Sequence, residues 1–141
     1  MKFTNSLIKG KLLKRYKRFF ADIKVNNKII TAHCPNTGSM QGLLDEGNEV
    51  LVTEHDDPKR KLKFTLEIIK AKKRYVGVNT HRANKIVNHG LENKLISEFK
   101  TIKNIKPEFK FSDDTRFDFL CDNNLIEAVS YTHLRAHETL R

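Results

Sequence analysis

The sequence predicts a protein of mixed β and α/β class, in which a closed barrel of five short strands precedes an incomplete α/β unit. Two observations predict the barrel: apolar and polar residues alternate with a period of two from Phe3 to Val78, and turn-forming residues separate the alternating runs. A third observation predicts the second unit. After Asn79 the apolar residues recur at helical spacing, and strand patterns then return with no further element to cover their sheet.

The predicted strands of the first unit cover residues 7–25, with a bend near Lys17, and residues 28–33, 49–54, 62–70 and 75–78. The segment 62–70 alternates strictly, which predicts one buried face and one mostly polar face carrying Lys63, Thr65 and Glu67. Asn26-Asn27 indicates a tight hairpin. Five short, curved strands are typical of the oligonucleotide/oligosaccharide-binding fold, or OB-fold. We therefore predict an OB-fold domain over residues 1–78.

The second predicted unit covers residues 79–128 and begins with a helical segment. Thr80 is its expected N-cap, and Gly90 interrupts the pattern. Strands are expected at residues 102–111, 116–121 and 125–129, with a turn at Asp113-Asp114. The apolar positions that define the helical spacing are Ile86, Val87, Leu91, Leu95, Ile96 and Phe99.

Residues 129–141 differ in composition from the rest of the chain. They contain two of the six histidines, His133 and His137, and no lysine. The segment resembles translated adaptor or vector sequence, so we predict a non-native tail and give these two histidines no role as a metal pair. A native helical tail is the alternative interpretation.

The charge of the chain lies mainly in its first half. The formal net charge is +10, and residues 1–75 hold 17 of the 27 Lys and Arg but only 8 of the 17 Asp and Glu. A local positive field attracts polyanions, and phosphate contacts release counterions from nucleic acid, although a solubilising lysine-rich surface has the same composition.

Two features predict a cytoplasmic protein that has no membrane partner. The chain holds no run of 18 apolar residues, and lysines interrupt the short apolar stretch at its N-terminus. Cys34 and Cys121 are far apart and lack a framework of further cysteines, so we expect reduced thiols.

One group of residues combines cations with aromatic rings at the start of a strand. In the segment RYKRFFADIKV, the cations Arg15, Lys17 and Arg18 can hold phosphates while Tyr16 or Phe19 stacks on a base. The same aromatics also fit a barrel core. A second basic cluster, Lys59, Arg60 and Lys61, lies on a predicted loop, where it can contact phosphate or simply be solvated.

The segment HCPNTGSMQG, residues 33–42, places His33 and Cys34 beside Pro35 and two glycines. Histidine and cysteine are zinc ligands, but no second pair stands at metal-ligand spacing. We therefore predict a structural turn, in which Asn36 and Thr37 hydrogen-bond to nearby backbone.

Five segments in order, RYKRF, HCPNTGSM, KRKLKFTLEII, VNTHRANKIV and RFDF, closely resemble the sugar fermentation stimulation protein family of bacteria and archaea. The resemblance covers about residues 9–127. It implies an N-terminal OB-fold and a C-terminal domain similar to the PD-(D/E)XK nucleases, here cut short. It also implies DNA binding linked to regulation of sugar (maltose) metabolism.

The acidic residues Asp118 and Glu127 fall on the second and third predicted strands of the second unit. Two carboxylates on adjacent strands can bind Mg²⁺ or Mn²⁺ and activate water, although ordinary surface acids look the same in sequence. In the family, the resemblance implies Glu-x-Lys at this point. Here Ala128 and Val129 follow Glu127, so the Lys is missing and we expect no confident catalytic residue.

The sequence thus predicts non-specific DNA binding through the basic barrel. A metal-dependent nuclease of the PD-(D/E)XK type, inactive in this form, is the alternative, and an RNA-binding barrel is a third hypothesis because stacking and phosphate contacts do not by themselves select the sugar.

Overall fold

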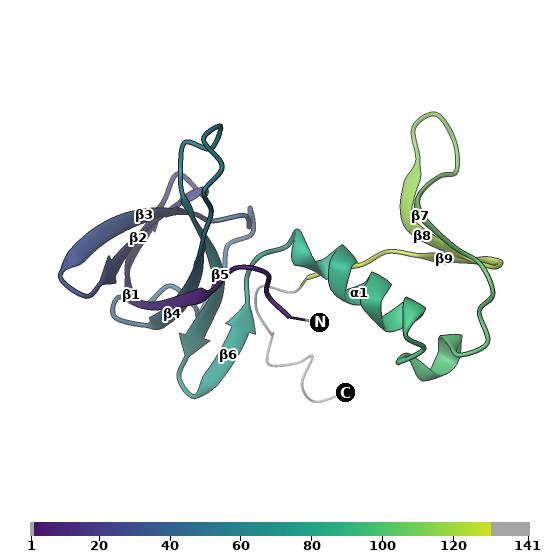
Figure 1. Ribbon diagram of the computed structural model, residues 1–141, viewed down its shortest axis with the longest axis horizontal. Coiled ribbons are helices and arrows are strands. Elements are labelled where there is room, and N and C mark those ends of the chain that lie inside the picture. The colour runs from purple at the N-terminus through teal and green to yellow at the C-terminus, as the bar shows by residue number, and fades with distance from the viewer. Residues whose placement is uncertain (1, 131–141) are drawn as a thin grey trace. The chain divides into compact units, whose positions relative to one another are not determined.

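The computed structural model describes residues 2–130, which divide into two compact units, residues 2–80 and residues 81–130 (Figure 1). The predicted tail at residues 129–141 lies outside the described residues from residue 131 onward.

The first unit is a closed five-stranded barrel of the OB type, which confirms the predicted fold class. Its sheet has the order β3-β2-β1-β4-β5-β6, and a parallel pairing of β3 with β5 closes the barrel, leaving β6 as an addition beside β5. The strands are β1 (Leu7–Tyr16), β2 (Phe20–Val25), β3 (Lys28–His33), β4 (Glu49–Glu54), β5 (Phe64–Ala71) and β6 (Arg74–Gly77).

The predicted bent strand over residues 7–25 is wrong, because this stretch forms two antiparallel strands. Tyr16 pairs directly with Phe20, so the chain reverses within three residues. Lys17 and Arg18 both adopt a left-handed backbone, with φ of 49° and 62°, and this turn separates β1 from β2. The hairpin predicted at Asn26-Asn27 is confirmed, since β2 ends at Val25 and β3 begins at Lys28.

The barrel core consists of inward-facing apolar side chains from all five barrel strands and the loop after β3. Gly10 lets β1 cross close to β2, because a Cβ atom at this position would lie 2.6 Å from Ile23 Cγ2 and 2.9 Å from the Lys24 carbonyl oxygen. The buried members are Leu12, Ala21, Ile23, Ala32, Cys34, Met40, Leu43, Val50, Val52, Leu66, Ile69 and Val78.

The second unit is a helix with a small antiparallel sheet. Helix α1 (Arg82–Glu92) and the short 3-10 helix η1 (Ser97–Phe99) precede the sheet, whose order is β7-β8-β9. The strands are β7 (Ile105–Lys110), β8 (Arg116–Cys121) and β9 (Asn124–Ile126). Its buried core is limited to Leu91, Phe119 and Cys121.

Two details of the predicted helix are wrong. Its N-cap is His81, not Thr80, because the Thr80 hydroxyl donates to the Pro35 carbonyl oxygen at 2.6 Å and belongs to the barrel unit. Gly90 does not interrupt α1. It lies inside the helix, where a Cβ atom would be 3.2 Å from Ile96 Cδ1, so the glycine allows the chain after the helix to pack closely. Among residues 2–130, no helix has both the length and the apolar character needed to cross a membrane.

Candidate nucleic-acid interface and carboxylate pair

The loops that carry the two predicted basic clusters precede strands that lie close together in the barrel. Phe20, the first residue of β2, pairs with His33 at the end of β3, and His33 in turn pairs with Thr65 at the start of β5. The loop before Phe20 carries Lys17, Arg18 and Phe19, and the loop before β5 carries Lys59, Arg60 and Lys61. The five cations of these two loops are here called the basic rim (Lys17, Arg18, Lys59, Arg60 and Lys61).

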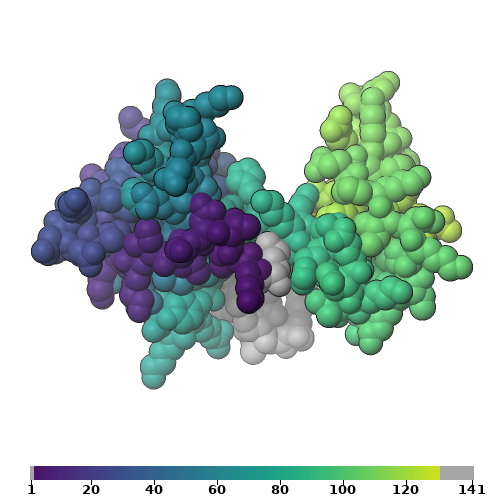
Figure 2. All heavy atoms as spheres, in the orientation of Figure 1, coloured from purple at the N-terminus to yellow at the C-terminus, as the bar shows by residue number. Residues whose placement is uncertain are grey.

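The side chains of the basic rim are mostly open to solvent. Lys17, Arg18, Lys59 and Lys61 are exposed, whereas Arg60 is half-buried and its Nη2 donates to Thr65 Oγ1 at 2.6 Å. The loop between β4 and β5 stands out from the barrel in the space-filling view, where it is coloured teal (Figure 2). Phe19, at 45% exposure, is the open aromatic ring at this rim.

Tyr16 and Phe20 lie on the outer face of the barrel, not in its core. They occupy paired positions on β1 and β2, with ring centroids 5.4 Å apart and stacked. The Tyr16 hydroxyl donates to Asp22 Oδ1 at 3.2 Å, and Lys14 Nζ lies 5.3 Å from the Tyr16 ring centroid. These contacts hold the two rings as a half-buried aromatic platform beside the basic rim.

Arg15 occupies a different environment from the other predicted phosphate contacts. Its Nη2 donates to the Asn36 carbonyl oxygen at 2.6 Å and its Nη1 to the Gly38 carbonyl oxygen at 2.8 Å. Its Nε donates to the Arg18 carbonyl oxygen at 3.1 Å. All three guanidinium nitrogens thus hold the loop after β3 against the turn between β1 and β2, and a phosphate contact by Arg15 stays a prediction.

The turn at residues 33–42 packs against the end of the barrel domain. Asn36 Nδ2 donates to the Val78 carbonyl oxygen at 3.1 Å, while its Oδ1 accepts from the Gly38 backbone at 2.9 Å. Cys34 Sγ lies 3.6 Å from Met40 Sδ, and burial raises the pKa of the Cys34 thiol. The described residues contain no group of three or more His, Cys, Asp and Glu that could hold a metal ion.

The predicted polar face of β5 is wrong at two positions. Thr65 and Glu67 are buried, at 5% and 2% exposure, because polar side chains from neighbouring segments cover them. The buried carboxylate of Glu67 accepts hydrogen bonds from the Thr53 hydroxyl at 2.9 Å and from Asn79 Nδ2 at 3.0 Å. This polar cluster fixes the base of the β4–β5 loop to the chain that leaves the barrel.

In the second unit, the structure brings Asp118 and Glu127 together. Asp118 lies on β8, and Glu127 follows directly after β9, not within the predicted strand. The two carboxyl groups lie close enough for each to change the pKa of the other. Asp118 Oδ1 also accepts from Asn84 Nδ2 at 2.9 Å, and its Oδ2 accepts from the Ala128 backbone N–H at 2.8 Å.

These contacts separate the pKa values of the two acids. Burial by itself raises the pKa of Asp118, but the hydrogen bonds from Asn84, the Ala128 backbone and Glu127 outweigh it and hold the pKa below its usual range. Partial desolvation, the hydrogen bond to Asp118 and the Asp118 charge raise the pKa of Glu127. Of the two acids, Asp118 therefore has the lower pKa and Glu127 the higher.

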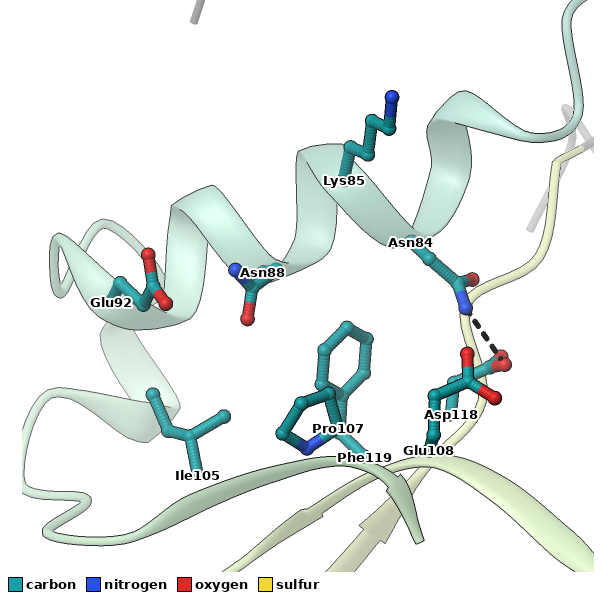
Figure 3. A pocket seen from close by; sticks show the side chains of 9 residues that line it. All are labelled: Asn84, Lys85, Asn88, Glu92, Ile105, Pro107, Glu108, Asp118 and Phe119. Atoms are coloured by element: carbon teal, nitrogen blue, oxygen red, sulfur yellow. Dashed lines mark hydrogen bonds between the residues drawn. The ribbon is translucent and has the colours of Figure 1, made fainter.

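A pocket of about 250 Å³ opens beside Asp118, between α1 and the strands β7 and β8 (Figure 3). Asn84 points from the helix toward Asp118, whereas Lys85 points away from it. Glu108 lines the same pocket and has a left-handed backbone with φ of 53°. Sequence reasoning missed Asn84 and Glu108. Asn84 stands in the segment VNTHRANKIV, so that motif was the available signal.

The fold and these sites define a two-unit protein, an OB-type barrel with a basic rim followed by a helix-and-sheet unit with an acidic pocket. Two family descriptions match the same two units: the SfsA N-terminal OB domain over residues 13–78, and the sugar fermentation stimulation protein RE domain over residues 81–139. The chain belongs to the sugar fermentation stimulation protein family.

Similar curated proteins carry the same description. A sugar fermentation stimulation protein homolog of Pelagibacter ubique is 60% identical over 99% of this chain and 62% of its own length. The homolog of Alteromonas mediterranea is 48% identical over 84% of this chain and 51% of its own length. The chain therefore spans about half to three-fifths of the length of these relatives.

A solved structure shares the fold. The structure of Pyrococcus furiosus SfsA in complex with Ca²⁺ superposes with a TM-score of 0.70 at 22% identity, covering 86% of this chain and 53% of that one.

Proposed function

We propose that this protein binds DNA without sequence preference, through the basic rim and the aromatic platform of its barrel. The observation that carries the proposal is the register Phe20–His33–Thr65, which places the strands that follow the two basic loops close together in the barrel. OB-folds bind oligonucleotides on the face of strands 2 and 3 and on the loops between strands 1 and 2 and between strands 4 and 5. The basic rim occupies those two loops.

The chemistry of the rim favours contact with the nucleic-acid backbone and with base faces. The exposed lysines and Arg18 can bind the phosphate of any nucleotide, and the exposed ring of Phe19 can stack on any base. No part of this arrangement reads base edges, so we propose non-specific binding. The link of the family to sugar fermentation leads us to place this binding in the regulation of sugar (maltose) metabolism.

The test is fluorescence anisotropy with a labelled oligothymidylate at several salt concentrations. We expect the variants Lys17→Gln/Arg18→Gln and Lys59→Gln/Lys61→Gln each to weaken binding about tenfold and to reduce the salt slope by about 0.7 for each phosphate that the variant no longer neutralises. The variant Lys72→Gln/Lys73→Gln, on the β5–β6 turn, removes the same charge away from the rim and is the matched control. Equal weakening in all three variants would contradict the proposal, and competition by oligouridylate at equal strength would favour RNA as an equivalent ligand.

A second candidate function rests on the proximity of the Asp118 and Glu127 carboxyl groups. A divalent cation can relieve the repulsion of two ionised carboxylates, and carboxylate oxygens are the ligands that Ca²⁺, Mg²⁺ and Mn²⁺ prefer. Asp118 and Glu127 would hold the ion, with the side-chain oxygen of Asn84 nearby, and the ion would supply charge neutralisation for a bound phosphate. The Ca²⁺ complex of the Pyrococcus protein supports this candidate.

Calorimetric titration with Ca²⁺, Mg²⁺ and Mn²⁺ tests the second candidate. We expect binding that Asp118→Asn abolishes and that Asp114→Asn, an exposed acid on the β7–β8 turn, leaves unchanged. Since Val129 stands where the family has its Lys, we expect cation binding without strand cleavage; cleavage that depends on Mn²⁺ and on Asp118 would instead establish the metal-dependent nuclease.

A further inference from the structure

A second positively charged hollow lies on the barrel outside the basic rim. Lys9, Gly10 and Lys11 of β1, with Lys24 and Asn26 of β2 and its turn, surround a pocket of about 340 Å³. Glu49 of β4 also lines it and lies 3.9 Å from Lys9 Nζ. The hollow, here called the lysine pocket, thus carries three cations against one acid.

The register explains why these lysines meet. Lys11 is the residue at which β1 changes partner, because it pairs with Lys24 of β2 on one side and with Glu49 of β4 on the other. Gly10 lets β1 approach β2 at this point, as a Cβ atom there would clash with Ile23 and the Lys24 carbonyl. The close crossing places Lys11 and Lys24 directly opposite each other on the outer face.

The lysine pocket lies on the same face as the aromatic platform. Along β1 and β2 the paired outer positions run from Tyr16 and Phe20, through Lys14 and Asp22, to Lys11 and Lys24. Ala21 and Ile23, the residues between them on β2, point into the core. Lys24 lies four residues after Phe20 along β2, a distance of about 13 Å.

We propose that the lysine pocket is a second phosphate-binding site, which holds the backbone of a single strand whose bases stack at the rim. This inference rests on the proposed function, and it deepens it by naming the ligand: single-stranded nucleic acid long enough to reach from the rim across the β1–β2 face. Two like charges placed opposite each other on adjacent strands repel, and a bound phosphate relieves this repulsion. A duplex cannot stack its bases on Phe19, so we expect single strands to bind more tightly than duplexes.

The experiment measures affinity against length for oligothymidylates between about 4 and about 16 nucleotides, the range of site sizes for one OB-fold. In the wild-type chain we expect a further rise in affinity once the strand reaches the lysine pocket. Lys11→Gln/Lys24→Gln should remove that rise, lower the salt slope for long strands by about 1.4, and leave short strands unaffected. Lys100→Gln/Lys103→Gln in the second unit is the charge-matched control.

The outcomes separate this inference from the proposed function. If the double variant keeps the wild-type length dependence while short strands still bind the rim, the lysine pocket holds no phosphate and the proposed function stands. If the double variant lowers the affinity for short and long strands equally, the two lysines act only through the overall positive field of the protein and the inference is overturned. If the wild-type chain binds no strand of any length, the proposed function itself fails.

Discussion

The two units of this chain differ in how completely they bury their apolar side chains. The barrel closes on itself and surrounds a core of 12 buried residues, whereas the helix-and-sheet unit buries three. In the second unit β7 and β9 are edge strands of the described sheet, and large apolar side chains remain open to solvent: Ile86, Leu95, Phe111, Leu125 and Val129. The barrel thus contains the contacts that a small domain needs, while the second unit is weakly supported by its own residues.

This difference in packing indicates which part of the protein each candidate site depends on. The basic rim stands on strands whose positions are determined by closure of the barrel, so we expect the proposed binding at the rim not to depend on the second unit. The carboxylate pair depends on Asn84 of α1, on β8 and on the backbone after β9, which only the small core holds together. Loss of packing in the second unit therefore separates its carboxyl groups before it affects the rim.

The largest expected effect is on the smaller core. Phe119→Ala removes the largest buried side chain of the second unit and should cost about 3–5 kcal/mol, enough to unfold that unit. Cys121 then reacts with a thiol reagent without denaturant, while Cys34 stays protected. Leu12→Ala, costing about 2–5 kcal/mol in the larger barrel core, is the matched variant and should leave both thiols slow to react. Simultaneous reaction of both cysteines in Phe119→Ala would show that the units unfold as one.

The next effect concerns the polar contacts that support the barrel. Arg15→Lys keeps the charge but loses the planar fork that holds the Asn36 and Gly38 carbonyl oxygens, and should cost about 1.5–3 kcal/mol of barrel stability. Thermal unfolding measures this destabilisation, and anisotropy measures DNA affinity in parallel. Full stability with unchanged affinity would mean that the loop after β3 needs only a cation at this position.

Alkaline pH should weaken both units through their thiols. Burial raises the pKa of Cys34 and of Cys121, whose pKa the nearby Asp122 raises further. Because folding favours the neutral thiol, each buried thiol contributes to the free energy of unfolding. This contribution is complete below the usual pKa of 9.0 and is lost as the pH rises toward the folded-state pKa. The slope is about 1.4 kcal/mol per pH unit for each thiol. Denaturant unfolding of Cys34→Ala and Cys121→Ala between pH 8 and about pH 10 measures the effect. The free energy of unfolding should fall less steeply with pH in the barrel for Cys34→Ala and in the second unit for Cys121→Ala. An unchanged fall would contradict the role given to the thiols.

The smallest expected effect is on the aromatic platform. Tyr16→Phe keeps the stack on Phe20 but removes the hydrogen bond to Asp22, so we expect a loss of about 0.5–1.5 kcal/mol in barrel stability. Affinity for single strands should change little, because the ring itself remains. Tyr16→Ala is the companion variant, and an equal loss of affinity in both would show that the hydroxyl, not the ring, contacts the nucleic acid.

Local patterns explain which predictions succeeded. The strands at residues 28–33 and 49–54 were predicted with their correct bounds, because their alternation and flanking turn residues depend only on neighbours in sequence. The same rule failed at residues 7–25, where a two-residue left-handed turn at Lys17 and Arg18 carries no glycine or proline to reveal it. Glu67 was predicted on a polar face, because the covering side chains Thr53 and Asn79 come from other segments and cannot be seen in one strand alone.

The sequence by itself determined the barrel class, the basic first half and the presence of two acids near the end of the chain, since composition and periodicity are local properties. Tertiary structure decided what those residues do. Pairing of β3 with β2 and with β5 placed the strands that follow residues 17–19 and 59–61 close together, and the packing of α1 on its sheet brought Asn84 to Asp118 across 34 residues of sequence. Such contacts depend on distances between segments that are far apart in the chain, and no local pattern encodes them.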